Sequence, residues 1–224
     1  MRKSSIVFRL AKKAIYMLQL MRTLLFRLRY RKTFDFGKNC MVNKCKVHNA
    51  SGGRVIVGPN VKLIACNFHF EDGVNKIVIG ENCYLVSTQF IERFGGENSI
   101  IVGKGTTTGG TCQFEASEGT TLHIGEDCMF SHNVKVWTTP YHSVLNKEGK
   151  RINPAESIRI GNHCWIGHSS FVLKGSIIPN GSIVGATALY TGKNEDENSV
   201  YAGTPAVKIK ENITWSRDLK SMDD

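Results

Sequence analysis

One histidine in this sequence lies where it could act as a general base. His142 belongs to the polar segment 138–157, which contains two prolines and one glycine and is therefore typical of a loop. A neutral imidazole can take the proton of a hydroxyl group as the oxygen attacks a carbonyl carbon. A histidine in a polar loop is more often only a solvated residue, so the hypothesis depends on what positions this loop.

The loop interrupts a repeat with a period of six residues. An aliphatic residue followed by glycine recurs at intervals of 22, 23, 22 and 36 residues. The strictest register runs through Ile160, Ile166, Val172, Ile178, Val184 and Tyr190. A period of six fits neither an amphipathic helix nor a simple strand, and it also disfavours an ordinary β-sandwich.

The repeat predicts an all-β fold of stacked coils. Each hexapeptide supplies a short strand and a turn, three of them close a triangular coil, and neighbouring coils pair their strands at ~4.8 Å. The period holds at Ile124, Phe130 and Val136 and resumes only at Ile160, so we expect residues 138–157 to form an extruded loop. No single coil can bury its own core, and stacking therefore stabilises the fold.

The C-terminal coils carry a family resemblance. The run IRIGNHCWIGHSSFVLKGSIIPNGSIVGATALYT, continued by SVYAGTPAVKIKENITW, resembles the hexapeptide-repeat acyltransferases over residues 124–215. It looks most like the sugar O-acetyltransferases that modify maltose, galactosides, or capsular and polysialic acid chains. The resemblance implies a left-handed parallel β-helix, a homotrimer, acetyl-CoA as donor, and active sites in clefts between subunits.

The same resemblance implies roles for particular residues. His142 lies 23 residues before Trp165 and matches the catalytic base of the family. Trp165 would form a wall of the cleft, and the backbone N–H of His168 would donate to the oxyanion. Pro140 and Tyr141 replace the residues usual before the histidine, so Glu148, Glu156 or a backbone carbonyl are candidates for orienting its ring.

Substrate contacts follow from the resemblance too. The pantetheine arm would run past Gly167, Gly185 and Ala186 at the coil edges, and Thr191 and Lys210 match positions near the nucleotide end of the donor. Gln113, opposite the loop in register, is a candidate contact for the acceptor. The family's usual basic position is displaced at Lys208, whose role is therefore open.

No metal site is expected. His163 and His168 are similar to the metal-binding histidines of hexapeptide carbonic anhydrases, but Leu173 stands where that pattern has its second histidine. The cysteines and histidines at positions 40, 45, 48, 66 and 69 match no compact zinc-finger spacing. The cysteines at 83, 112, 128 and 164 fall at the corner position of the repeat, which favours small buried side chains.

Charge divides the chain into regions. Residues 1–32 hold ten of the 29 Lys and Arg residues and no acid, so they carry the whole net charge of +10. We expect a basic amphipathic helix over 1–32, a polar transition over 33–53, the β-helix over 54–212 and a tail over 213–224. The helix suits anionic lipid or packs on the β-helix or a neighbouring subunit, whereas the neutral body argues against nucleic acid.

The resemblance, together with the loop that contains His142, implies an acetyl-CoA-dependent O-acetyltransferase acting on a sugar or polysaccharide, in a ternary complex with His142 as general base. The alternatives are an N-acetyltransferase of a nucleotide-linked amino sugar and a non-catalytic β-helix scaffold. With no signal peptide evident and free thiols expected, we predict the cytoplasm, with peripheral membrane contact through 1–32.

Overall fold

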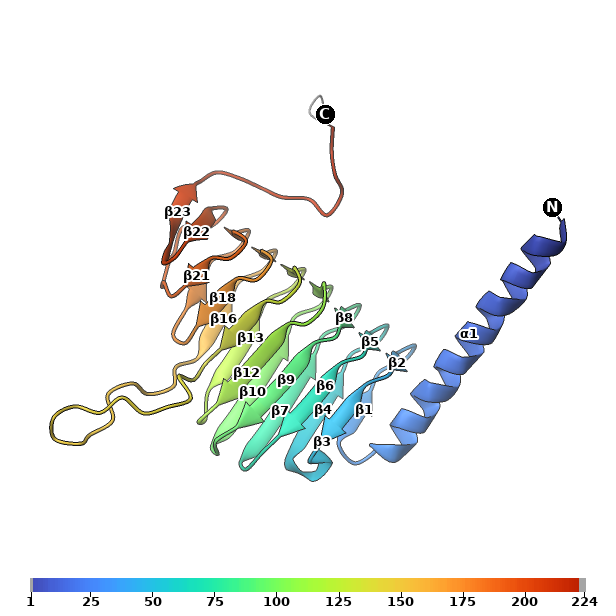
Figure 1. The fold of residues 1–224 in the computed structure, drawn as a ribbon, viewed down its shortest axis with the longest axis horizontal. Coiled ribbons are helices and arrows are strands. Elements are labelled where there is room, and N and C mark those ends of the chain that lie inside the picture. Colours follow the sequence, from blue (N-terminus) through green and yellow to red (C-terminus); the bar gives the residue numbers. More distant parts are fainter. Residues whose placement is uncertain (1, 222–224) are drawn as a thin grey trace.

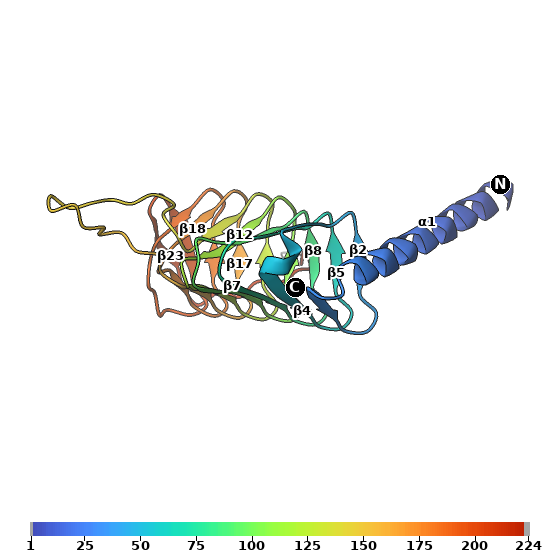
Figure 2. The same ribbon diagram turned by 90° about the horizontal axis from the view of Figure 1, so that it is seen from below.

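The chain forms a three-sided parallel β-helix with one long helix projecting from its first coil. The computed structural model describes residues 2–221. Helix α1 (Arg2–Arg29) comes first and the coils then stack along one axis, as Figures 1 and 2 show from two directions. A short 3₁₀ turn, η1 (Ala50–Gly52), lies between the first and second coils.

Each side of the prism is one sheet. The first sheet contains β1 (Phe34–Phe36), β4 (Gly53–Val57), β7 (Val74–Ile79), β10 (Glu97–Val102), β13 (Thr121–Ile124), β16 (Ile158–Ile160) and β19 (Ile177–Ile178). The second contains β2 (Met41–Asn43), β5 (Lys62–Ile64), β8 (Tyr84–Val86), β11 (Thr107–Thr108), β14 (Met129–Phe130), β17 (Trp165–Ile166), β20 (Ile183–Val184), β22 (Val200–Gly203) and β23 (Ala206–Lys210). The third contains β3 (Lys46–His48), β6 (Asn67–Phe70), β9 (Gln89–Arg93), β12 (Gln113–Ser117), β15 (Lys135–Trp137), β18 (Phe171–Leu173) and β21 (Leu189–Tyr190).

Strand register confirms the stacked-coil prediction. The aliphatic residues of the repeat stand in one row, in which Ile79 pairs with Val102, Val102 with Ile124, and Ile124 with Ile160. They are fully buried and form the core of the prism. Only the closing pair β22–β23 is antiparallel among the strands of the described chain.

The glycine after each aliphatic residue has a steric cause. A Cβ on Gly58 would lie 2.7 Å from the backbone nitrogen of Glu81 in the next coil, and one on Gly80 would lie 2.6 Å from that of Lys104. No side chain fits where two backbones approach so closely. The aliphatic–glycine pair in the sequence therefore marks the positions where one coil stacks on the next.

The first coil begins earlier than the sequence suggested. Residues 33–53, expected as a polar transition, contain β1, β2 and β3, and β1 pairs in parallel with β4. The aliphatic–glycine pair of this coil is Phe36-Gly37, in which an aromatic residue takes the aliphatic position. Because Phe36 is not aliphatic, the pattern of an aliphatic residue followed by glycine did not identify this coil.

The predicted extruded loop is confirmed. The chain leaves the prism after β15, projects far from it, and returns at β16 (Figure 1). An antiparallel bridge between Leu145 and Arg151 joins its two arms. Thr138 and Thr139 at its base are buried, so the loop starts from a fixed point.

A buried carboxyl group in β9 should make folding sensitive to pH. Glu92 is fully buried, neither of its oxygens has a hydrogen-bond partner within the described residues, and burial raises its pKa to about 8. The unfolded chain ionises this group near pH 4.5. The contribution of the neutral carboxyl to the free energy of unfolding is therefore fully present below pH 4.5 and is lost as the pH rises toward 8.

Glu92→Gln should raise the free energy of unfolding at pH 8 by roughly 1–3 kcal/mol, because the amide cannot ionise. Denaturant titrations at pH 5 and pH 8 would measure this, and the gain should shrink at the lower pH. Glu97→Gln, at an exposed position of β10, is the matched control. Equal losses of stability in the wild type and Glu92→Gln between the two pH values would contradict the assignment.

Candidate active site

Trp165 stands on the outer side of the second sheet. It lies in β17 between Met129 and Ile183, its neighbours in register, and is 36% exposed. Its indole N–H donates to the hydroxyl oxygen of Ser131 at 3.3 Å. This hydrogen bond fixes the ring against the sheet and leaves part of the indole open to a ligand.

His168 lies in the turn that follows β17. The Gly167 N–H donates to Val184 O at 2.8 Å, and the Thr187 N–H donates to His168 O at 2.7 Å, so the turn is fixed to the next coil. The His168 N–H donates to no group in the described part of the chain. A fixed, unused donor of this kind is suited to a developing oxyanion.

Gly167 has a structural reason to be glycine. A Cβ there would lie 2.6 Å from the backbone nitrogen of Ala186. The turn that contains Gly185 and Ala186 is thus stacked directly on the turn that contains Gly167 and His168, which precedes it by eighteen residues, or three hexapeptides.

The backbone around His142 is held within the loop. Its N–H donates to Pro140 O at 2.7 Å, and the side-chain amide of Asn153 donates to its carbonyl at 2.8 Å. The imidazole is exposed, and within the described residues no side chain hydrogen-bonds to it. The ring is therefore free to meet a substrate.

Neither acidic candidate orients the His142 ring. The carboxylate of Glu156 forms ion pairs with Lys174 at 2.6 Å and Lys193 at 3.7 Å. Glu148 is exposed in the distal turn of the loop. The contacts that do hold the loop were missed in the sequence and involve the residue just before the histidine.

Tyr141 fastens the loop to the third sheet. Its hydroxyl donates to the buried carboxylate of Glu115 in β12, and its ring lies 5.1 Å from that of Trp137. Arg93 pairs with the same carboxylate at 3.4 Å and lies 5.5 Å from the Tyr141 ring centre. Burial raises the pKa of Glu115, while the Tyr141 hydrogen bond and the Arg93 charge act in the opposite direction.

A second carboxylate holds both arms of the loop. Glu118, in the turn after β12, accepts hydrogen bonds from Thr139 on the outgoing arm and from Arg151 on the returning arm, both at 2.5 Å. Arg151 lowers the pKa of Glu118. The sequence offered no local signal for these contacts, because the partners are separated by 21 and 33 residues.

The C-terminal segment folds back beside Trp165. Trp215 is buried and stacks on His163 with ring centres 4.2 Å apart, and its indole N–H donates to His163 O at 2.8 Å. Arg217 pairs with Asp127 at 2.9 Å. Segment 213–220, expected as a tail, thus bounds a cavity of about 690 Å³ whose lining includes Trp165 and Trp215.

The remaining predicted residues lie apart. Thr191 follows β21 and Lys210 ends β23, so both stand exposed on the last coils, while Gln113 lies in the third sheet beside Lys135. Lys208 instead forms ion pairs with Asp196 and Glu211, each at 3.1 Å.

One chain does not bring the two main candidates together. The His142 loop leaves the corner between the third and first sheets, whereas Trp165 lies on the second sheet and His168 at the corner between the second and third. A site that uses both residues needs surfaces from different sides of the prism.

The metal-binding candidates have other partners. His163, besides stacking on Trp215, pairs through Nδ1 with Asp127 at 2.7 Å. Among residues 2–221, no three His, Cys, Asp or Glu side chains gather as metal ligands. All seven cysteines are free thiols, and those at 83, 112, 128 and 164 are buried in the core, as the repeat indicated.

Comparisons with known proteins agree with this architecture. No protein-family profile matches the chain. The polysialic acid O-acetyltransferase of Neisseria meningitidis is 32% identical over 172 residues, which cover 74% of this chain and 76% of that protein. The polysialic acid O-acetyltransferase of Escherichia coli O1:K1 is 30% identical over 126 residues, which cover 55% of this chain and 40% of that protein.

A solved structure shows the same fold. The crystal structure of a polysialic acid O-acetyltransferase superimposes with a TM-score of 0.56 at 25% identity, covering 84% of this chain and 95% of that one. The predicted fold class, a left-handed parallel β-helix, and the predicted family resemblance are both confirmed.

Tyr141→Phe should loosen the loop without unfolding the coils, because it removes the hydrogen bond to Glu115 and leaves the ring in place. Hydrogen–deuterium exchange should rise in residues 138–157 and stay constant in the strands. Tyr84→Phe, at an exposed position of β8, provides the control. If exchange in the loop stays at the wild-type level, the hydroxyl is not what holds it.

Proposed function

The chain belongs to the hexapeptide-repeat O-acetyltransferases, and we propose that it transfers an acetyl group from acetyl-CoA to a hydroxyl group of a surface polysaccharide. The observation that carries this proposal is the clamped loop 138–157, which presents an exposed His142 in a chain related over three quarters of its length to polysialic acid O-acetyltransferases. A scaffold protein would have no need for such a loop.

In the proposed reaction His142 is the general base. Its neutral imidazole takes the proton of the acceptor hydroxyl while the oxygen forms a bond to the thioester carbonyl carbon. The His168 N–H donates to the resulting oxyanion. The intermediate then collapses, the C–S bond breaks, and His142 returns the proton to the sulfur of coenzyme A. Both substrates are present together, so no covalent enzyme intermediate is needed.

The last coils are proposed to bind the donor. Gly185 and Ala186 leave the coil edge free of large side chains, which suits an extended pantetheine arm. Thr191 and Lys210 are exposed at the same end of the prism, where a hydroxyl and a cation could bind the nucleotide phosphates. Gln113 is proposed as a contact for the acceptor.

We further propose a homotrimer with shared active sites. Because His142 and Trp165 lie on different sides of one prism, a site that uses both is complete only when a neighbouring copy supplies one of them. Cyclic assembly gives every copy the same pair of contacts.

Subunit complementation tests the shared site. His142→Ala and Trp165→Ala should each be weakly active, but mixed trimers assembled from equal amounts should recover about one quarter of wild-type activity, because that fraction of sites pairs two intact residues. The test is to refold the two variants together and to compare the acetyl-transfer activity with that of each variant refolded alone. Recovery no greater than the sum of the separate variants would place both residues in one chain's site.

Removal of the base should slow the chemistry and spare the fold. His142→Ala should lower the rate of acetyl transfer by about 10²–10⁴, the usual contribution of a positioned general base, while coenzyme A binding stays close to wild type.

The assay should use labelled acetyl-CoA with hydroxyl and amine acceptors, so that O-transfer and N-transfer are distinguished. His48→Ala, an exposed histidine on the first coil, is the matched control. Near-normal transfer by His142→Ala to the best acceptor would end the assignment.

A further inference from the structure

We propose that the face of α1 turned away from the β-helix binds the surface of an anionic lipid membrane. The inference does not depend on the proposed acetyl transfer, since it concerns a different part of the molecule. It follows from how the helix is docked, which side chains it exposes, and how its charges are placed.

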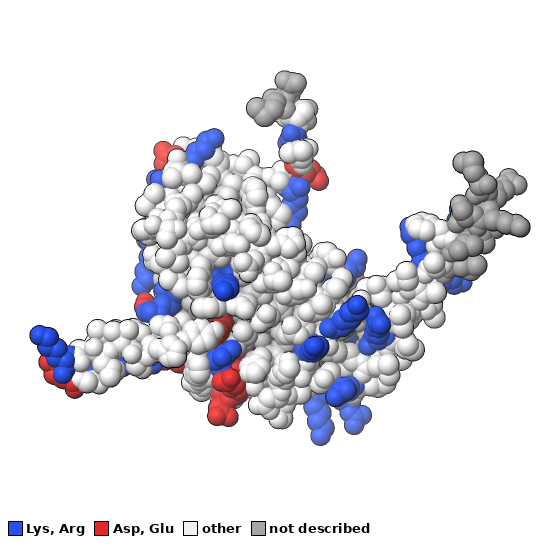
Figure 3. All heavy atoms as spheres, in the orientation of Figure 1, with Lys and Arg blue, Asp and Glu red and all other residues white. Residues whose placement is uncertain are grey.

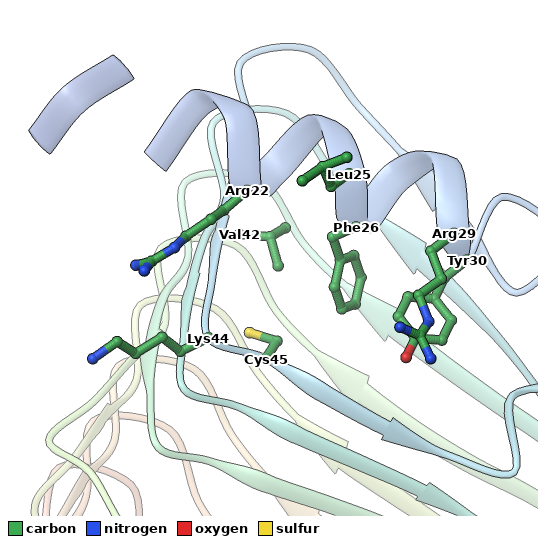
Figure 4. Close-up of a pocket in the computed structure, with 8 residues that line it drawn as sticks. All are labelled: Arg22, Leu25, Phe26, Arg29, Tyr30, Val42, Lys44 and Cys45. Atoms are coloured by element: carbon green, nitrogen blue, oxygen red, sulfur yellow. The ribbon is translucent and has the colours of Figure 1, made fainter. Parts of the chain in front are cut away.

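The C-terminal part of α1 is docked firmly on the first coil. Thr23 lies against Val42, whose N–H donates to the Thr23 hydroxyl at 2.9 Å, and Arg22 donates to the side chain of Asn43 at 2.9 Å. Phe26 is buried and meets Phe34 edge to face at 5.1 Å. Figure 4 shows Phe26 and Tyr30 pointing from the helix toward this coil. The helix therefore has a fixed orientation.

The rest of the helix projects beyond the coils into open space (Figures 1 and 2). An apolar stripe, defined here as Ala14, Met17, Met21, Leu24 and Leu28, repeats at intervals of three and four residues. Met21, Leu24 and Leu28 each precede by two positions a docked residue, Thr23, Phe26 or Tyr30. Two positions are ~200° around a helix, so the stripe faces away from the β-helix.

The stripe is exposed along its whole length. The four large side chains are 52–59% exposed, which is a high value for Met and Leu in a folded protein. No other segment of the described chain covers them. Such a continuous apolar surface indicates a binding face.

Cations border the stripe on both sides. Arg9 and Lys13 lie along one edge of the helix and Arg29 along the other, as their positions at 100° per residue require, and all three are exposed. Arg22 and Arg27 are turned toward the first coil instead, where they donate to Asn43 at 2.9 Å and to Phe36 O at 3.1 Å. Neither Arg9, Lys13 nor Arg29 forms an ion pair within the described residues. Figure 3 shows Lys and Arg along α1 and where it meets the first coil.

An anionic membrane can bind both the apolar stripe and the cations at its edges. Apolar side chains enter the boundary between head groups and acyl chains, while long basic side chains at the edges reach the lipid phosphates. A bundle of α1 helices would bury the stripe but would also bring together eight cations per chain with no acidic partners in the helix. No helix among residues 2–221 has the length and apolar character to cross a bilayer, so the contact lies along the surface.

Vesicle co-sedimentation of the full chain tests the proposal with two adjacent substitutions. Met17→Glu places a charge in the stripe, whereas Tyr16→Glu places the same charge on another face at a similarly exposed position. Wild type should sediment with vesicles of phosphatidylcholine and phosphatidylglycerol, and high salt should weaken this binding. Met17→Glu should weaken it at least about tenfold and Tyr16→Glu only a few-fold.

Vesicles of phosphatidylcholine alone should bind weakly. Wild-type protein that remains unbound with the anionic vesicles would overturn the proposal. Equal losses from both substitutions would also overturn it, because the stripe would then have no role. A lower oligomer mass for Met17→Glu in sedimentation equilibrium, without vesicle binding by the wild type, would instead identify the stripe as a contact between copies.

Discussion

The structure depends on the hydrogen-bonded stacking of one coil on the next. Each strand pairs in parallel with the equivalent strand one coil away, and at the corners the backbones approach so closely that a Cβ on Gly80 would lie 2.6 Å from Lys104 N. Every coil is thus fixed by its neighbours and none is stable alone. This constraint produces the repeat in the sequence, because each strand needs one aliphatic residue that points inward and each close approach of two backbones needs a glycine.

This constraint explains how much of the fold could be predicted. The period of six identified the coils from Ile124 onward, and its interruption located the loop between β15 and β16. The first coil escaped because Phe36 replaces the aliphatic residue before Gly37, although the steric need for glycine is unchanged. Position in the repeat is therefore a more reliable signal than residue type, since the prism interior accepts any apolar side chain of suitable size.

Site residues could be predicted from the sequence only where they belong to one short, continuous motif. His142 was predicted from the loop together with the family resemblance, and Trp165 from that resemblance. The contacts that hold these residues join distant parts of the chain: Tyr141 to Glu115 across 26 residues, and Trp215 to His163 across 52. Such pairs have no local pattern, because stacking brings together residues whose separation depends on the length of every excursion between them.

The geometry of the prism also explains why catalysis would need more than one surface. A three-sided stack has flat sides and convex corners, so it offers no deep cleft of its own, whereas binding sites are concave. Two segments project from the surface of the prism: the loop at one corner and segment 213–220 on the second sheet. Each is anchored by buried or ion-paired side chains, such as Glu115 for the loop and Arg217 for the segment. The loop leaves the stacking intact because its two ends meet at coil positions, where the Glu156 N–H donates to Thr138 O at 2.9 Å, and segment 213–220 begins only after the last strand. A rigid core that tolerates excursions can thus hold reactive groups firmly at its edges, and a second copy placed against those edges would enclose the space between them.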